Sequence, residues 1–244
     1  MRLIRVMCSG RVDLGHILQA FSNGMDGVFI AGCRLNECNY TTQGNYHALN
    51  TALLCKRVME HIGLNPERLS IEFMSSAEGI RFAEVTNDFV RKVRDLGALG
   101  ESEGIGKAEL KSKLAEVRKL VPYIKVMKND KLGTRLTSVE QYEEFFTREE
   151  IDSLFREVVS YYIDPDKCQA CMICARRCPA EAIISVRNQV HVIDQEKCIK
   201  CGTCFDVCPP RFGAVTKISG EPVPPPLPEE KRTIVRKTKE AEVA

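Results

Sequence analysis

The sequence predicts two differently built domains: an α/β three-layer N-terminal domain with a parallel sheet, and a small C-terminal α+β domain. Three apolar strand-like runs in residues 1–98 alternate with helical patterns, as in parallel strands joined by helices. Eight of the 12 cysteines fall in residues 161–219, in two runs of identical spacing. With 244 residues, the chain is long enough for two domains of ordinary size.

The predicted strands and helices of the N-terminal domain follow one another along the chain. Buried parallel strands are expected at Leu3–Met7, Gly27–Ala31 and Leu69–Met74. Helical patterns follow them near Val12–Ser22, Tyr46–Ile62 and Gly79–Leu96. Such consecutive strand–helix units imply right-handed crossovers, and the loops at the carboxyl ends of the strands are where functional residues gather.

The remainder of the chain divides into three parts. Residues 99–160 are charged and mostly helical in pattern, which predicts a helical connector. In the domain at 161–219, short strands are predicted at Tyr162–Ile163, Ile183–Val186, Gln189–Ile193 and Ala214–Ile218, the middle two forming a hairpin. Residues 220–244 begin rich in proline and continue highly charged, so we expect an extended arm that lies on a partner or is disordered.

The two cysteine runs carry the strongest chemical signal. They read Cys168-x2-Cys171-x2-Cys174-x3-Cys178-Pro179 and Cys198-x2-Cys201-x2-Cys204-x3-Cys208-Pro209. This is the spacing of a bacterial-type dicluster ferredoxin, which holds two [4Fe–4S] clusters and takes the fourth ligand of each from the other run. We therefore expect one cluster on Cys168, Cys171, Cys174 and Cys208. The other is expected on Cys198, Cys201, Cys204 and Cys178.

Two other uses of these cysteines fit less well. A disulfide framework is typical of short secreted chains in an oxidising compartment. A zinc ribbon uses paired C-x2-C knuckles and not four-cysteine runs that end in proline. Because the run occurs twice with matching prolines, iron–sulfur clusters are the better interpretation.

Three further cysteines follow predicted strands of the N-terminal domain. Cys8 follows the first strand, and Cys33 and Cys38 lie in the loop after the second. Because these loops meet at one edge of a parallel sheet, the three thiols are expected to converge in a metal or redox site. The alternative is that they are small apolar residues of the core. Cys55 lies well inside a helical pattern, and a core thiol is expected there.

Several weaker features are assigned structural roles. His47 lies near the Cys38 loop and could complete a metal site, but a capping or solvent-facing side chain is the simpler interpretation. His191 is interpreted as an ordinary strand residue, because a Rieske-type centre needs two histidines on one iron. Gly104–Lys107 lacks the first glycine and the Ser/Thr of a phosphate loop, so a loop or the start of a helix is expected.

The N-terminal motifs resemble those of the delta subunit of methyl-viologen-reducing hydrogenase. The similar segments are Cys8-Ser9-Gly10-Arg11-Val12-Asp13, Gly27-Val28-Phe29-Ile30-Ala31-Gly32-Cys33, Glu37-Cys38-Asn39-Tyr40 and Gly44-Asn45-Tyr46. The resemblance runs to about residue 98 and implies a [2Fe–2S] cluster that involves Cys8, Cys33 and Cys38. An earlier C-x2-C pair of the family has no counterpart here, so a fourth ligand would come from Cys55, a non-cysteine group or a partner chain.

The family's role implies partners as well. Its delta subunit relays electrons between a hydrogenase or formate dehydrogenase and a heterodisulfide-reductase-A-like flavoprotein, which can bifurcate electrons. Residues 146–226 are similar to the ferredoxin tail of NADH-oxidising flavoprotein subunits of bifurcating complexes. The similar segments are Phe146-Thr147-Arg148-Glu149-Glu150-Ile151, Ile163-Asp164-Pro165-Asp166-Lys167-Cys168 and His191-Val192-Ile193-Asp194-Gln195-Glu196-Lys197-Cys198. This second resemblance implies a module held inside a complex.

Charge and hydropathy exclude several functional classes. A net charge of +2 predicts no special attraction to nucleic acid, and no apolar run approaches the roughly 20 residues that span a membrane. The charged N-terminus predicts no signal peptide, so a cytoplasmic protein is expected. Abundant thiols beside oxygen-sensitive clusters favour an anaerobic or microaerobic cell. No catalytic nucleophile–base pair is recognisable. We therefore expect a non-catalytic electron-transfer subunit. The alternatives are a docking adaptor whose N-terminal domain carries no cluster, and a thiol-redox enzyme that uses Cys8, Cys33 or Cys38.

Overall fold

The computed structural model describes residues 1–40, 43–138 and 141–233. The chain divides into two compact units, Met1–Phe155 and Arg156–Ala244. Among the described residues, no helix has the length and apolar character that a membrane span requires.

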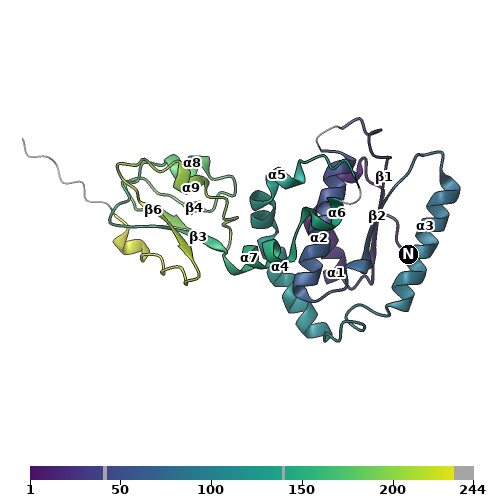
Figure 1. Ribbon diagram of the computed structural model, residues 1–244. Coiled ribbons are helices and arrows are strands. Elements are labelled where there is room, and N and C mark those ends of the chain that lie inside the picture. Colours follow the sequence, from purple (N-terminus) through teal and green to yellow (C-terminus); the bar gives the residue numbers. More distant parts are fainter. Residues whose placement is uncertain (41–42, 139–140, 234–244) are drawn as a thin grey trace, which may run out of the picture. The chain divides into compact units, whose positions relative to one another are not determined.

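The N-terminal unit is built around a two-stranded parallel sheet. Strand β1 (Val28–Gly32) pairs with β2 (Leu69–Phe73), with Val28 opposite Leu69. Helices α1 (Leu14–Ser22) and α2 (Asn45–Ile62) cover one face, and α3 (Gly79–Asp95) covers the other (Figure 1). This arrangement confirms the predicted three-layer α/β domain, because α2 supplies the crossover that two parallel strands need.

The predicted first strand is wrong. Residues 3–7 form no strand, and Leu3 and Ile4 are 80% and 82% exposed. Their apolar run favours a strand locally, but a strand forms only where a neighbour supplies ladder hydrogen bonds and an apolar cover. No ladder of the described residues includes this segment. Cys8 therefore follows an extended segment rather than a strand, and precedes a 3₁₀ turn, η1 (Ser9–Arg11).

Helical periodicity explains how the helices bury their apolar sides. The buried residues of α1 recur at intervals of three and four, as Leu14, Ile17, Leu18 and Phe21. Helix α4 (Lys107–Met127) packs against α1 with a similar stripe, Leu110, Leu114, Val117 and Val121. The unit is completed by α5 (Asn129–Leu132), α6 (Gln141–Phe145) and most of α7 (Arg148–Arg156). The region that was expected to be charged and mostly helical therefore contributes to the N-terminal core.

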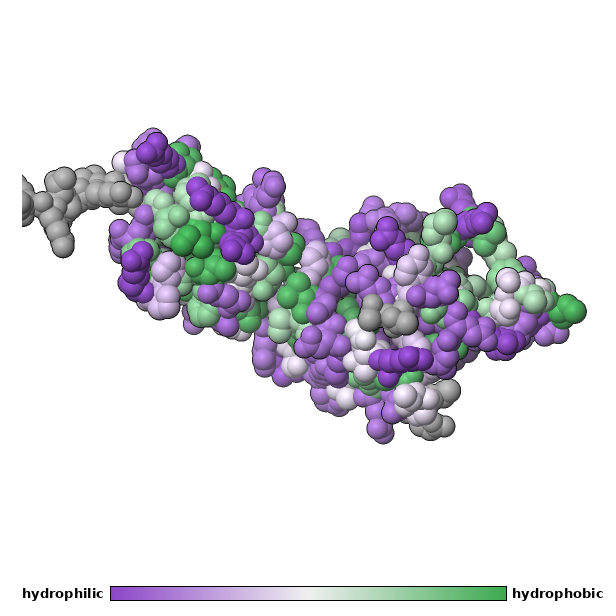
Figure 2. All heavy atoms as spheres, turned by 90° about the horizontal axis from the view of Figure 1, so that it is seen from above, coloured by the Kyte–Doolittle hydropathy of each residue, from purple (hydrophilic) through white to green (hydrophobic). Residues whose placement is uncertain are grey.

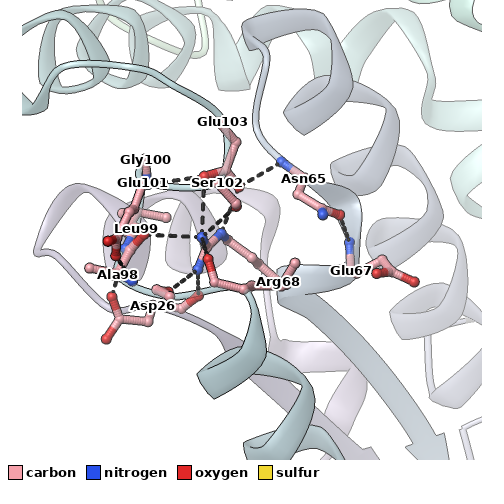
Figure 3. Close-up of polar contacts among 12 residues, drawn as sticks. Asp26, Asn65, Glu67, Arg68, Ala98, Leu99, Gly100, Glu101, Ser102 and Glu103 are labelled. Carbon is pink, nitrogen blue, oxygen red and sulfur yellow. Dashed lines mark hydrogen bonds and ion pairs between the residues drawn. The ribbon is translucent and has the colours of Figure 1, made fainter.

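A buried arginine ties the loop after α3 to both strands. Arg68 ends a 3₁₀ turn, η2 (Pro66–Arg68), directly before β2, and its side chain is fully buried. Its Nε donates to Glu103 Oε1 at 2.7 Å (Figure 3). Its other N–H groups donate to the backbone carbonyl oxygens of Asp26, Leu96, Gly97 and Ala98. A buried charge is costly unless it is paired and hydrogen-bonded, so this network holds the loop in one conformation.

Replacing Arg68 by methionine should lower the free energy of unfolding of the N-terminal unit by about 3–5 kcal/mol, because Glu103 would be left buried without its partner. Denaturant unfolding measures the change. Lys92→Met is the matched control, since its ion pair with Glu67 is about half exposed and such pairs contribute about 1 kcal/mol or less. Equal losses in the two variants would contradict the assignment of a stabilising network to Arg68.

The C-terminal unit is a small α+β domain, as predicted. Strand β3 (Val159–Ile163) pairs with the antiparallel β6 (Val215–Ser219), and β4 (Ile183–Ile184) pairs with β5 (Val192–Ile193) as a hairpin. A short helix contains the third cysteine of each run: α8 (Ile173–Arg177) in the first and α9 (Thr203–Asp206) in the second. The unit also contains a 3₁₀ turn, η3 (Glu229–Lys231).

The two halves of this unit repeat the same local structure. Asp164 Oδ1 accepts from the N–H of Asp166 at 3.0 Å, and Asp194 Oδ1 accepts from the N–H of Glu196 at 3.0 Å. In each half, the same aspartate's carbonyl oxygen then accepts from the N–H of the first cysteine of the run. The aspartate turns therefore set the start of both cysteine loops in the same way.

The proline-rich segment lies against its own domain. The N–H of Val190 donates to Arg232 O at 2.7 Å, and Gln189 forms an isolated antiparallel β-bridge with Thr233. Val223 and Leu227 line a small cavity together with residues of β3 and β5. Val223 and Leu227 are thus partly buried against their own domain. The prediction for residues 234–244 concerns residues outside the described part of the chain.

Candidate metal centres

The first group of thiols in the C-terminal unit combines the two cysteine runs. The Cys174 side chain interacts electrostatically with Cys168 and Cys171 of its own run and with Cys208 of the other. Cys168 and Cys174 are buried, and Cys208 packs against the same core. The structure thus brings together the four cysteines that the spacing predicted for one cluster.

The second group mirrors the first. Cys198 interacts with Cys201 and with Cys178, which belongs to the first run. Cys204 interacts with Cys198 and Cys201, and also with Cys174 of the first group. The second predicted set is therefore also assembled, and the two groups are close enough for one buried thiol of each to influence the other.

The donor set of each group fits an iron–sulfur cluster. Burial, followed by the negative charge of neighbouring thiolates, raises the pKa of Cys174 to about 11 and that of Cys204 to about 12. Four crowded thiols can ionise together only if a cation compensates their charge, and all-sulfur sets of this spacing suit iron–sulfur clusters. No group of three or more His, Cys, Asp or Glu side chains in the described part of the chain is placed to hold a single metal ion.

The backbone of both loops directs N–H groups at the cysteine sulfurs. The N–H of Ala182 donates to Cys178 Sγ and the N–H of Lys200 donates to Cys198 Sγ, each at 3.4 Å. Such bonds stabilise the negative charge of a bound cluster. The two cysteine loops also have left-handed residues at matching positions, Ala170 and Met172 in the first run and Lys200 and Gly202 in the second.

His191 is a residue of this site that the sequence interpretation missed. It is not an ordinary strand side chain, because it is only 1% exposed and its Nδ1 lies 3.4 Å from Cys174 Sγ. Burial lowers the pKa of its imidazole. The internal repeat offered a signal, since His191 stands seven residues before Cys198 just as Tyr161 stands seven residues before Cys168.

The N-terminal unit brings Cys8, Cys33 and Cys38 together. The Cys38 thiol is close enough to both other thiols for each of them to shift its pKa. Cys33 follows β1 directly, so the group lies at the carboxyl end of that strand, where the sequence placed it. The convergence is therefore present even though the strand expected before Cys8 is not.

Close backbone packing fixes these loops against one another. A Cβ atom at Gly44 would lie 2.4 Å from Cys38 Sγ, and one at Gly32 would lie 2.7 Å from Ser9 Oγ. The buried Asn45 donates from Nδ2 to the carbonyl oxygens of Cys33 and Arg34, at 3.0 and 2.6 Å. The glycines thus allow the loops to approach, and Asn45 holds the Cys33 loop on the start of α2. Asn45 is a second residue whose role local sequence did not reveal.

Cys33 and Cys38 differ in their tendency to ionise. Burial raises the pKa of Cys33, and its neighbour Cys38 raises it further. Burial also acts on Cys38, but hydrogen bonds from the backbone N–H groups of Tyr40 and Asn45 and from the other two thiols lower its pKa overall. Cys38 therefore ionises more readily than Cys33, and the thiolate is both the nucleophilic and the metal-binding form of cysteine.

The other candidates take structural positions. Cys55 is fully buried in α2, where burial strongly raises the pKa of its thiol, as expected of a core residue. His47 is half-buried, and burial and Lys125 lower the pKa of its imidazole. Its Nδ1 has no hydrogen-bond partner among the described residues. Gly106 caps α4, which confirms the start of a helix at Gly104–Lys107.

Each of the two halves of the chain matches a known protein family. The family model described as "Methyl-viologen-reducing hydrogenase, delta subunit" matches residues 1–97, and a 4Fe-4S dicluster domain matches residues 160–209. The iron-sulfur subunit of the F420-non-reducing hydrogenase of Archaeoglobus profundus is 43% identical over 96 residues, which are 39% of this chain and 69% of that protein.

The chain belongs to the delta-subunit family. A second member, the vhc iron-sulfur subunit of the F420-non-reducing hydrogenase of Methanococcus voltae, is 38% identical over 108 residues, or 44% of this chain and 74% of that protein. The chain is thus an iron–sulfur protein related to electron-transfer subunits of hydrogenases and heterodisulfide reductases, with a dicluster ferredoxin domain after its delta-subunit domain.

The same delta-subunit domain occurs inside a much larger relative. One subunit of the ferredoxin/F420H2-dependent CoB-CoM heterodisulfide reductase of Methanosarcina acetivorans is 43% identical over 99 residues, which are 41% of this chain. The match spans only 12% of that protein. The domain is therefore found both in a separate small subunit and within a heterodisulfide reductase chain.

Proposed function

We propose that the chain is the electron-transfer iron–sulfur subunit of a multi-subunit oxidoreductase complex and relays single electrons between partner subunits. The observation that carries this proposal is the assembly of two four-thiol groups, each completed by the last cysteine of the other run. When bound, two [4Fe–4S] clusters supply one-electron acceptance and donation.

The proposed ligands follow from these groups. Cys168, Cys171, Cys174 and Cys208 hold the first-run cube. Cys198, Cys201, Cys204 and Cys178 hold the second-run cube. The interaction between Cys174 and Cys204 supports a short path between the two cubes, since each is a proposed ligand of a different one.

The relatives suggest which partners the relay serves. The delta-subunit domain inside the heterodisulfide reductase chain supports a position next to a heterodisulfide-reductase-A-like flavoprotein. A hydrogenase, a formate dehydrogenase or an NADH-oxidising flavoprotein is the other proposed partner, in a cytoplasmic complex that bifurcates electrons at a flavin. The resemblance of residues 146–226 to the tails of NADH-oxidising subunits supports the last of these.

The surface of the C-terminal unit suits contact with partners. Ile173, which directly precedes Cys174, and Phe205, which directly follows Cys204, are both exposed. Figure 2 shows hydrophobic surface on the unit that carries α8 and α9. Apolar side chains beside a cluster allow a partner to approach closely and exclude water from the contact.

For the N-terminal group, we propose a [2Fe–2S] cluster that uses Cys8, Cys33 and Cys38 as ligands. The lowered pKa of Cys38 and the direct contacts among the three thiols support a metal site. They also support a second candidate function, thiol–disulfide chemistry, because a stabilised thiolate beside two thiols is the arrangement that such exchange needs. A cluster-free docking adaptor is the third candidate.

Iron quantification on anaerobically purified chain separates these candidates. The relay with a third cluster predicts about ten Fe per chain and the other two candidates predict about eight. Cys38→Ser should lower the content by about two Fe only in the first case, with Cys55→Ser as the control for loss of a core thiol. Thiol chemistry is favoured if the wild-type chain holds about eight Fe and Cys38→Ser loses the turnover of the complex while its cluster spectra stay unchanged. A chain that holds zinc or no metal overturns the proposed function.

A further inference from the structure

The C-terminal unit repeats one segment with a single chemical change at its start. Tyr161 and His191 stand seven residues before the first cysteine of their runs, and the segments Ile163–Cys168 and Ile193–Cys198 share Ile-Asp at their start and Lys-Cys at their end. The two side chains therefore occupy equivalent positions in the two halves. One carries a phenol and the other an imidazole.

Tyr161 lies against the second run. A Cβ atom at Gly202 would lie 2.7 Å from Tyr161 Oη. The tyrosine also lines a small cavity together with four proposed ligands of the second-run cube, Cys178, Cys198, Cys201 and Cys204. The strand that leads into the first run thus covers the cube of the second.

His191 takes the corresponding position over the first run. Its Nδ1 lies 3.4 Å from Cys174 Sγ, and its Nε2 lies 3.2 Å from the thioether sulfur of Met172. Met172 and Gly202 are equivalent left-handed residues of the two loops. The imidazole thus presents a ring nitrogen directly to a proposed ligand sulfur of the first-run cube.

The chemistry of the two sulfurs decides which nitrogen carries the proton. Cys174 as a ligand is a thiolate and can only accept, and the thioether of Met172 is a much weaker acceptor. A neutral imidazole therefore keeps its proton on Nδ1 and donates it to Cys174 Sγ. This hydrogen bond is shielded from bulk solvent, since His191 is 1% exposed.

We propose that His191 is a positioning residue whose N–H···S bond to Cys174 raises the reduction potential of the first-run cube. The inference rests on the proposed function, because it requires that cube to be present. Reduction adds negative charge to the cluster and its ligand sulfurs, so a donor at Cys174 stabilises the reduced form more than the oxidised form. The second-run cube has a different side-chain donor, Thr203, whose Oγ1 lies 3.3 Å from Cys201 Sγ. Because the ligand sulfur that His191 contacts belongs to the first-run cube, its effect should be largest on that cube.

A redox titration of the anaerobically purified full chain, followed by EPR, tests this assignment. His191→Phe keeps a planar ring but removes the donor, and should lower one of the two midpoints. At a fixed ambient potential, the ratio of reduced to oxidised cube should fall roughly threefold to tenfold. His191→Asn keeps an N–H donor near the position of Nδ1 and should stay close to the wild type. Tyr161→Phe removes the hydroxyl at the equivalent position of the other half. It should not change the midpoint of the first-run cube.

The outcomes separate this inference from the proposed function. A wild-type chain without two cubes overturns the proposed function. Two assembled cubes with unmoved midpoints in His191→Phe overturn the inference alone. Equal shifts in His191→Phe and His191→Asn, or shifts of equal size in both midpoints, indicate repacking and also overturn it. If His191→Phe loses its cube, His191→Leu, which also lacks a donor, is titrated in its place against His191→Asn.

Discussion

Replacement of Cys178 by serine should abolish the second-run cube and leave the first-run cube in place. Cys178 belongs to the first run in sequence, yet its thiol interacts with Cys198 of the second. The interacting neighbours of Cys174 include Cys208 of the second run. A serine oxygen is a poorer ligand for a cluster that is otherwise held by sulfur. A mutation in the first cysteine run should therefore remove the cube that is held mainly by the second run.

Iron content and EPR measure this result. The variant should lose about four of the roughly eight Fe of the two cubes and one of two cluster signals. Cys208→Ser is the reciprocal variant and should remove the other signal. Cys55→Ser is the control, because that thiol is buried in α2 of the N-terminal unit. Loss in Cys178→Ser confined to the cube of Cys168 would mean that each run supplies all four ligands of its own cluster.

The features that sequence predicted well are those set by local spacing. The cysteine runs dictate loops of fixed length, and the aspartate turns before Cys168 and Cys198 start both loops alike. The helices were predictable from apolar periodicity, as in the Leu14–Ser22 helix, whose buried side recurs at intervals of three and four. In such cases the residues that determine the structure are neighbours in the chain.

The features that sequence did not predict depend on distant residues. Leu3–Met7 has the composition of a strand, but whether it pairs depends on a neighbouring strand that local pattern cannot specify. His191 resembles any polar residue of a strand until the fold places it on Cys174. Likewise, Arg68 is buried only because the 97–103 loop folds over it. For each of these residues, tertiary contacts outweigh local preference.

Removal of iron should unfold the C-terminal unit and leave the N-terminal unit folded. Strands β4 and β5 have two residues each, and buried cysteines make up part of the small apolar core. A domain of this size buries little apolar surface, so the clusters must supply much of its folding free energy. The N-terminal unit has a core of its own around α1 and α2.

Hydrogen exchange after anaerobic chelation, read segment by segment, measures this prediction. Amides of β3 and β6 should lose protection by roughly a thousandfold or more, as for a domain that gives up about 5 kcal/mol of stability. Amides of α2 should keep their protection, and they serve as the internal control within the same molecule. Iron and sulfide added back under reducing conditions should restore β3 and β6. If both strands stayed protected without iron, the apolar core alone would be sufficient, and the cysteine loops would be a site built on a stable scaffold rather than part of what folds it.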